Sequence, residues 1–311
     1  MRIATVQTSQ GPQLAVAIAD GSSAVLMQKL WPGGPQDMLA AMQVEAEIMR
    51  RLAANGSAGA VRSDELHFLP PIPRPGKIVC LALNNSANST RILKGPSHPA
   101  MFNKPSSSLL GHGRPIRLRK DYGRVHPEPE LVVVIGKGGA DIAAADAYDH
   151  VFGYTIMNDL TSPTMRGDDT FHYRAIHPSK DDPQQIEYLD TWVSYPGRYK
   201  GTDGFGPIGP WIATRAEIPD PHALTVTCTH RGRVVTEDTT NNLTYKVPDV
   251  IAYVSYYMTL EQGDIISMGT ALKAAGGSGQ AVQTVDLTTL GGPIDVTISG
   301  IGTLSNPVEH R

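Results

Sequence analysis

The residues whose types and spacing most clearly suit chemistry are Glu128 and Glu130, at the head of the β-forming run Leu131–Ile135. Side chains at positions i and i+2 of a strand point to the same face. Two carboxylates placed side by side repel each other, and they do not both stay ionised unless a cation lies between them. An edge strand that carries acidic residues for solubility is the alternative, and the pair alone does not decide between the two.

A third carboxylate, Asp159, ends a second apolar run that begins at Tyr154. Three convergent carboxylates with no histidine or cysteine beside them suit a hard divalent ion, Mg²⁺, Mn²⁺ or Ca²⁺, better than zinc. Glu128, Glu130 and Asp159 are therefore candidate metal ligands.

The composition argues against several classes of protein. At 311 residues the chain can hold one large domain, or a small one and a large one. A net charge of -3, without a run of Lys or Arg, argues against nucleic-acid binding. No apolar stretch approaches the length of a membrane span, and Met1–Val6 has the pattern of a strand instead of a signal sequence. Cys80 and Cys228 lie in apolar runs, so we expect them to be buried free thiols. Together, these features predict a soluble cytoplasmic protein.

The start of the chain has the pattern of a small α+β domain. Two strand-like runs, Arg2–Thr8 and Leu14–Ala19, come first. A stretch from Pro35 to Ala54 follows, and its apolar residues recur at near-helical spacing.

A proline-rich segment, Leu69–Gly76, comes next. It can be neither a helix nor a central strand, because proline fixes φ and offers no amide donor. We expect it to link a small domain, residues 1–70, to a larger one, residues 71–311.

The larger part is mainly β, and its helix Val247–Thr259 is expected to pack over a sheet, with Pro248 in its first turn. The polar stretch Arg166–Glu187 has little apolar periodicity and is expected to be an excursion loop. The strand candidates are Ile78–Leu83, Leu131–Ile135, Phe152–Met157, Leu224–Thr229, Asp264–Met268 and Ile294–Ser299. These elements predict an α+β, mainly β fold.

Eight motifs of the larger part, in order along the chain, resemble the fumarylacetoacetate hydrolase family. They are Lys77–Asn84, Pro99–Lys104, His126–Gly136, Gly153–Asp159, Pro207–Ile212, Leu260–Asp264, Gly269–Thr270 and Gly300–Pro307. The first segment resembles the small N-terminal domain that many bacterial members carry. The resemblance implies a mixed β-roll catalytic domain, usually dimeric, that holds Mg²⁺ or Mn²⁺ over a small acidic substrate with a 2-oxo acid or β-diketone group.

The resemblance also implies roles for individual residues. Glu128, Glu130 and Asp159 match the family's three metal carboxylates. Lys200 matches a lysine that the family places close to the metal, and Thr270 matches a threonine that usually contacts substrate. An ammonium balances the excess negative charge of three carboxylates on one divalent ion.

The chain departs from the family at the turn that follows the opening strand. Family hydrolases and decarboxylases carry a His-x-x-Glu pair there, on a short helix that acts as a lid. The pair activates the attacking water or positions the substrate. This chain has Asn88 and Arg91 at those positions. An amide is no general base near neutral pH, and a guanidinium cannot accept a proton.

A second departure follows Asp159, where the family's arginine and glutamine positions hold Pro163 and Arg166. Arg91 and Arg166 are thus new at lid and pocket positions. Arginine grips carboxylates bidentately, so both are candidate substrate-binding residues for an acidic substrate, together with Asn88. Alternatively, both arginines face solvent or pair with Asp168 and Asp169.

With the pair gone, proton transfer needs another group. His172, inside the polar excursion, is the histidine to test first. Lys200 is the second candidate, because an ammonium close to a metal ion has its pKa pushed down.

Three functions follow. The leading one is a divalent-metal-dependent hydrolase that cleaves a C–C bond in a small 2-oxo or 1,3-diketo carboxylic acid. The alternative enzyme is a lyase of the same fold, namely a 2-keto-3-deoxy acid dehydratase, a decarboxylase or an isomerase, since these need a stabilised enolate but no activated water. The third is a non-catalytic relative that binds metal and acid without turnover.

Overall fold

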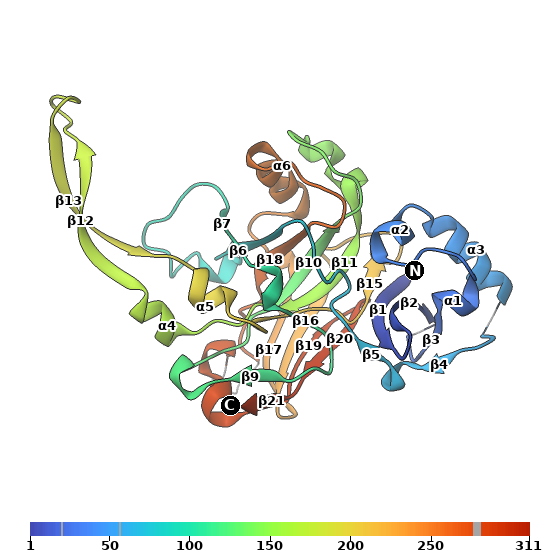
Figure 1. Ribbon diagram of the computed structural model, residues 1–311. Coiled ribbons are helices and arrows are strands. Elements are labelled where there is room, and N and C mark those ends of the chain that lie inside the picture. Colours follow the sequence, from blue (N-terminus) through green and yellow to red (C-terminus); the bar gives the residue numbers. More distant parts are fainter. Residues whose placement is uncertain (20, 56, 276–280) are drawn as a thin grey trace.

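The computed structural model describes residues 1–19, 21–55, 57–275 and 281–311, and β-strands dominate the described part (Figure 1). The largest sheet has 11 strands and a second sheet has four. Short helices lie around these sheets. The predicted α+β, mainly β class is confirmed.

The large sheet runs in the order β4-β3-β2-β1-β15-β11-β10-β18-β6-β7, and β5 pairs with β1. Its strands are β1 (Arg2–Thr8), β2 (Gly11–Ile18), β3 (Ser23–Leu26), β4 (Val61–Arg62), β5 (His67–Phe68), β6 (Ile78–Ala82), β7 (Ala100–Asn103), β10 (Pro129–Ile135), β11 (Val151–Asn158), β15 (Ile212–Thr214) and β18 (Ile265–Thr270). The second sheet is β17 (Arg233–Thr239), β16 (Thr225–His230), β19 (Ile294–Ile298) and β20 (Gly302–Asn306). Three strand pairs complete the described β structure: β12 (Thr170–Pro178) with β13 (Ile186–Ser194), β8 (Leu109–Leu110) with β14 (Gly206–Pro207), and β9 (Ile116–Leu118) with β21 (Val308–His310).

The helices of the described part are short. The α-helices are α1 (Met27–Leu30), α2 (Met38–Met42), α3 (Glu45–Asn55), α4 (Pro163–Asp168), α5 (Gly197–Gly201), α6 (Val247–Tyr257) and α7 (Leu287–Leu290). The 3₁₀ turns are η1 (Ser63–Glu65), η2 (Ser86–Asn88), η3 (Ser106–Ser108), η4 (Lys120–Tyr122), η5 (Ala144–His150), η6 (Thr240–Asn242) and η7 (Val282–Thr284). The predicted helix from Val247 is present, with Pro248 in its first turn.

The centre of the large sheet is formed by β10 and β11, in which every residue is buried. Unbroken runs of apolar and β-branched residues are typical of strands that are covered on both faces. β10 is antiparallel to both of its neighbours, β11 and β18. The register places Pro129 opposite Asn158 and Glu130 opposite Thr270. The start of β10, the end of β11 and the end of β18 therefore meet at one place.

The N-terminal segment joins the same sheet. β1 pairs antiparallel with β15, which in turn pairs with β11. The predicted helical stretch from Pro35 is divided into α2 and α3; α2 begins after Asp37 because the Asp37 carboxylate accepts a hydrogen bond from Ala40 N. The proline-rich segment 69–76 is neither helix nor strand. The domain boundary near residue 70 stays a prediction.

The excursion after Asp159 is an ordered arm instead of a loop, so that expectation was wrong. α4 leads into β12, and β12 and β13 form a two-stranded arm that projects from the rest of the molecule (Figure 1). Aromatic and β-branched side chains such as Phe171, Ile176 and Trp192 favour strands, and apolar and polar residues alternate from Phe171 to Ala175.

Two smaller expectations concern cysteines and membrane spans. Cys80 and Cys228 are buried and free, as predicted. Within the described residues, no helix combines the length and the apolar character that crossing a membrane requires.

Candidate functional site

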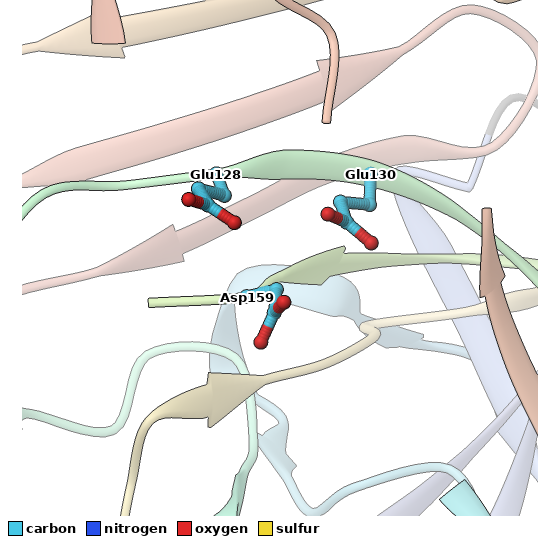
Figure 2. A group of neighbouring side chains, drawn as sticks. All are labelled: Glu128, Glu130 and Asp159. Carbon is cyan, nitrogen blue, oxygen red and sulfur yellow. The ribbon is translucent and has the colours of Figure 1, made fainter. Parts of the chain in front are cut away.

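Three carboxylates converge where β10, β11 and β18 meet. Glu128 directly precedes β10, Glu130 is its second residue, and Asp159 directly follows β11. Two hydrogen bonds fix this corner: Glu128 N donates to Asn158 Oδ1 (2.8 Å) and Asp159 N donates to Glu128 O (2.9 Å). The two glutamates lie side by side with Asp159 facing them (Figure 2), and one oxygen of each carboxylate lies within 4.8 Å of the others.

The end of β18 holds Glu130 in place. Ser267 Oγ donates to Glu130 Oε2 (2.5 Å), and Gly269 N donates to the same oxygen (3.2 Å). Thr270 Oγ1 lies 3.0 Å from Glu130 Oε1 and 3.2 Å from Glu128 Oε2. Gly269 has a φ of +95°, and a Cβ there would lie 2.9 Å from the Cβ of Asn84, so this donor position requires glycine.

Two lysine side chains pair with the carboxylates. Lys200 Nζ lies 2.5 Å from Glu128 Oε2 and 2.6 Å from Asp159 Oδ2. Lys104 Nζ lies 2.6 Å from Asp159 Oδ1 and donates to the carbonyl oxygen of Lys200. Lys104 was not among the predicted site residues, although it ends the motif Pro99–Lys104.

Burial and charge shift the pKa values of these groups. Burial, together with the nearby Asp159 carboxylate, raises the pKa of Glu130 to about 8. Burial also opposes ionisation of Asp159, but Lys104 and Lys200 outweigh it and lower the pKa of that carboxyl. For Lys200, burial favours the neutral amine, yet the Asp159, Glu128 and Glu130 carboxylates together raise the pKa above its ordinary value. Without an ion, carboxylates surround this ammonium; the expected lowering of the Lys200 pKa beside a metal ion stays a prediction.

The donor set fits a hard divalent cation. All three groups offer carboxylate oxygens, and three carboxylates against the ammonium groups of Lys104 and Lys200 leave one excess negative charge. Burial and the neighbouring carboxylates raise the pKa of Glu130, so this carboxyl holds a proton that a bound cation would displace.

A pocket of about 410 Å³ opens beside the carboxylates. It brings together most of the predicted substrate-binding and catalytic residues, which line it from separate segments of the chain: Asn88, Arg91, Arg166, Lys200 and Thr270. Glu128 lines it as well, while Glu130 and Asp159 are almost completely buried behind the pocket wall.

His172 lies outside the residues that line this pocket. It is an exposed residue of β12, stacked on Trp192 of β13 with the ring centroids 4.5 Å apart. His172 and Trp192 are directly opposite each other in the pairing of β12 with β13. Directly opposed residues of an antiparallel pair project from the same face, so the two rings stack. Within a single chain, His172 therefore has no contact with the carboxylates.

A different histidine, His126, lines the pocket. Its Nδ1 lies 3.1 Å from the carbonyl oxygen of Pro127, and its Nε2 lies 3.8 Å from Glu128 Oε1. Because a carbonyl only accepts, Nδ1 carries the hydrogen and the neutral ring keeps a lone pair on Nε2. Burial lowers the pKa of His126 and so favours this neutral form.

Residues 77–309 match the family model described as fumarylacetoacetate (FAA) hydrolase C-terminal. The oxaloacetate tautomerase YisK of Bacillus subtilis (strain 168) is 31% identical over 249 residues, which cover 78% of this chain and 73% of that protein. The mitochondrial oxaloacetate tautomerase fahd2 of Xenopus laevis is 28% identical over 313 residues, covering 99% of this chain and 90% of that protein. Among solved structures, 5-carboxymethyl-2-hydroxymuconate delta-isomerase from Mycobacterium smegmatis is 27% identical with a TM-score of 0.69, covering 100% of this chain and 99% of that chain.

Proposed function

Because the chain belongs to the fumarylacetoacetate hydrolase family, we propose that it is a divalent-metal-dependent tautomerase that interconverts the keto and enol forms of a small 2-oxo acid. This function replaces C–C bond hydrolysis as the leading hypothesis, and it lies within the isomerase alternative. The curated relatives above are oxaloacetate tautomerases, and the solved relative is an isomerase.

The observation that carries the proposal is the contrast between an intact carboxylate group and an altered turn at the pocket. Glu128, Glu130 and Asp159 converge as a metal site requires. The turn beside them presents Asn88 and Arg91, neither of which can activate water. Hydrolysis needs an activated water, whereas tautomerisation needs only a stabilised enolate and a proton carrier.

Different residues of the pocket can stabilise the enolate, hold the substrate and carry the proton. A divalent ion held by the three carboxylates would supply Lewis-acid stabilisation of negative charge, and the all-oxygen donor set favours Mg²⁺ or Mn²⁺, with Ca²⁺ as an alternative. Thr270 offers a hydroxyl and Lys200 an ammonium at the edge of the pocket, where they can hold the substrate oxygens. Neutral His126 offers a lone pair on Nε2 for the proton that moves.

The test is a tautomerisation assay on protein stripped with EDTA and reloaded with Mg²⁺. The decay of the ultraviolet absorbance of enol-oxaloacetate should accelerate only with the reloaded protein. Glu130→Gln should lose at least about a hundredfold in kcat/KM, because one metal ligand is gone. Glu309→Gln makes the same chemical change at the surface, where Glu309 pairs with Arg117, and should leave the rate unchanged.

Two results would count against the proposal. Release of pyruvate from acylpyruvates without faster tautomerisation would favour the hydrolase. Binding of oxaloacetate to the Mg²⁺-loaded protein, with no turnover of any 2-oxo acid, would favour the non-catalytic relative.

A further inference from the structure

Two arginines at the pocket have no carboxylate partner. Arg91 and Arg166 both line it, and neither side chain takes part in an ion pair or hydrogen bond with the residues that the structure describes. Asp168 and Asp169 are already bound by Arg198, whose Nη2 lies 3.6 Å from Asp168 Oδ2 and 2.9 Å from Asp169 Oδ1. The alternative in which this acidic pair neutralises Arg166 is therefore excluded.

Local structure directs Arg91 and Arg166 to the pocket. Arg91 N donates to Asn88 O (2.8 Å), so these residues lie one turn apart on the same side of the chain. Arg166 lies three residues after Pro163 on α4, and both line the pocket. Two turns from distant segments thus bring two exposed arginines, each without an ion-pair partner among the described residues, to one cavity.

The amide of Asn88 adds a polar group to the same pocket. Asn88 is only 2% exposed, lines the pocket, and makes no side-chain hydrogen bond within the described part of the chain. Its amide atoms are not fully withdrawn from solvent, so a ligand group in the pocket can reach them and accept a hydrogen bond.

Apolar residues also line the pocket. Leu81, Met101, Phe102 and Leu272 give the pocket an apolar lining that suits a short hydrocarbon segment. The Lys200 ammonium lies at the metal carboxylates, where it contacts Glu128 and Asp159, and so belongs to the end of the pocket assigned to the 2-oxo acid. Arg91 and Arg166 are therefore the cationic lining groups that are free to bind a further anion.

We propose that Arg91 and Arg166 bind a second carboxylate of the substrate, with the Asn88 amide as an additional hydrogen-bond donor. The substrates are then 2-oxo dicarboxylic acids, and the corresponding monocarboxylic acids are discriminated against. The inference rests on the proposed function in one respect only, namely that the 2-oxo acid end of the ligand lies at the metal carboxylates. Guanidinium groups suit this task because they bind carboxylates bidentately.

Calorimetric titration of Mg²⁺-loaded protein with two ligands of equal length tests the inference. The ligands are 2-oxoglutarate and 2-oxopentanoate, which differ only in the distal carboxylate. We expect the wild type to bind 2-oxoglutarate about tenfold to a hundredfold more tightly, the range for hydrogen bonds to a charged group. Arg91→Gln and Arg166→Gln should each reduce this preference, and the double variant should abolish it. Arg91→Lys should restore part of it, because a charge remains without the bidentate fork.

A control variant and the possible results separate the second carboxylate site from the proposed function. Arg117→Gln removes an exposed arginine that pairs with Glu309 and should leave the preference unchanged. Equal wild-type affinity for both ligands would overturn the inference, even if oxaloacetate is tautomerised. A preference that disappears in the double variant, without any tautomerisation of oxaloacetate, would support the carboxylate site and contradict the proposed function. Thermal unfolding of each variant checks that the fold is kept.

Discussion

Lys104 and Asp159 form a buried ion pair, with Nζ 2.6 Å from Oδ1 and side-chain exposures of 0% and 1%. The same ammonium donates to the carbonyl oxygen of Lys200, whose own Nζ holds Asp159 Oδ2. Lys104 therefore positions both a candidate metal ligand and the lysine beside it, without lining the pocket itself.

Lys104→Met should destabilise the protein. The substitution keeps most of the side-chain volume but leaves Asp159 with one ammonium fewer in a buried place. Breaking a buried pair from one side costs about 3 kcal/mol, which urea unfolding of the EDTA-treated protein would measure. Lys120→Met at the surface is the matched control and should change the free energy of unfolding by less than about 0.5 kcal/mol. A loss of similar size in both variants would contradict the role of Lys104.

Ser267→Ala should weaken metal binding without unfolding the protein. Ser267 Oγ donates to Glu130 Oε2 at 2.5 Å and so orients this ligand. Loss of such an orienting partner typically costs tenfold to a hundredfold in metal affinity. Titration with Mn²⁺, followed by calorimetry, would show the change. Ser106→Ala, at an exposed serine of η3, should retain the wild-type Kd.

The contribution of Glu130 to the stability of the metal-free protein, obtained by comparison with Glu130→Gln, should fall as pH rises from about 4.5 to about 8. In this window the unfolded chain has released the Glu130 proton, while the folded protein retains it because burial, aided by Asp159, raises the pKa to about 8. The unfolded state thus binds fewer protons, so the free energy of unfolding decreases with pH. Urea unfolding at pH 5.5, 6.5 and 7.5 measures this slope, and Glu130→Gln should flatten it.

Metal should remove this pH dependence. Mg²⁺ replaces the proton on Glu130, so the loaded protein keeps its stability toward pH 8 and its apparent metal affinity rises with pH up to that value. A slope that is identical with and without Mg²⁺ would show that Glu130 does not hold the ion.

We also expect a homodimer, in which the arm of β12 and β13 packs on a second copy of the chain. An isolated two-stranded hairpin is only marginally stable in water, yet Tyr188 and Trp192 on this arm are 58% and 68% exposed. Tyr188→Ser combined with Trp192→Ser should shift the molecular mass in light scattering from that of a dimer toward that of a monomer. A wild-type protein that is monomeric at micromolar concentration would refute this expectation.

The sequence predicted the convergence of the three carboxylates because its signals are local. Glu128 and Glu130 share a strand face by the strand period, and Asp159 ends the adjacent apolar run. The β10 and β11 runs are unbroken, which is the pattern of strands buried on both faces.

Other parts depend on distant contacts that no local pattern contains. Lys104 directly follows β7, where a lysine is usually solvated, and its ammonium lies inside because it binds Asp159 and the carbonyl oxygen of Lys200 in α5. His172 occupies a polar stretch that suggested a loop near the pocket, but pairing of β12 with β13 stacks its ring on Trp192. The hairpin itself is a local element: apolar and polar residues alternate from Phe171 to Ala175, a strand signal that the polar composition of the stretch obscured.

The short strand β15 has a neighbour on each side, β1 and β11. Its residues Ile212 and Ala213 are completely buried. A protein cut near residue 70 would lose β1 and leave β15 with a row of free backbone donors and acceptors along an apolar edge. Such an edge is a template for pairing with other chains. The N-terminal segment therefore covers a sheet edge that would otherwise be open to pairing with other chains, quite apart from any share in the chemistry of the protein.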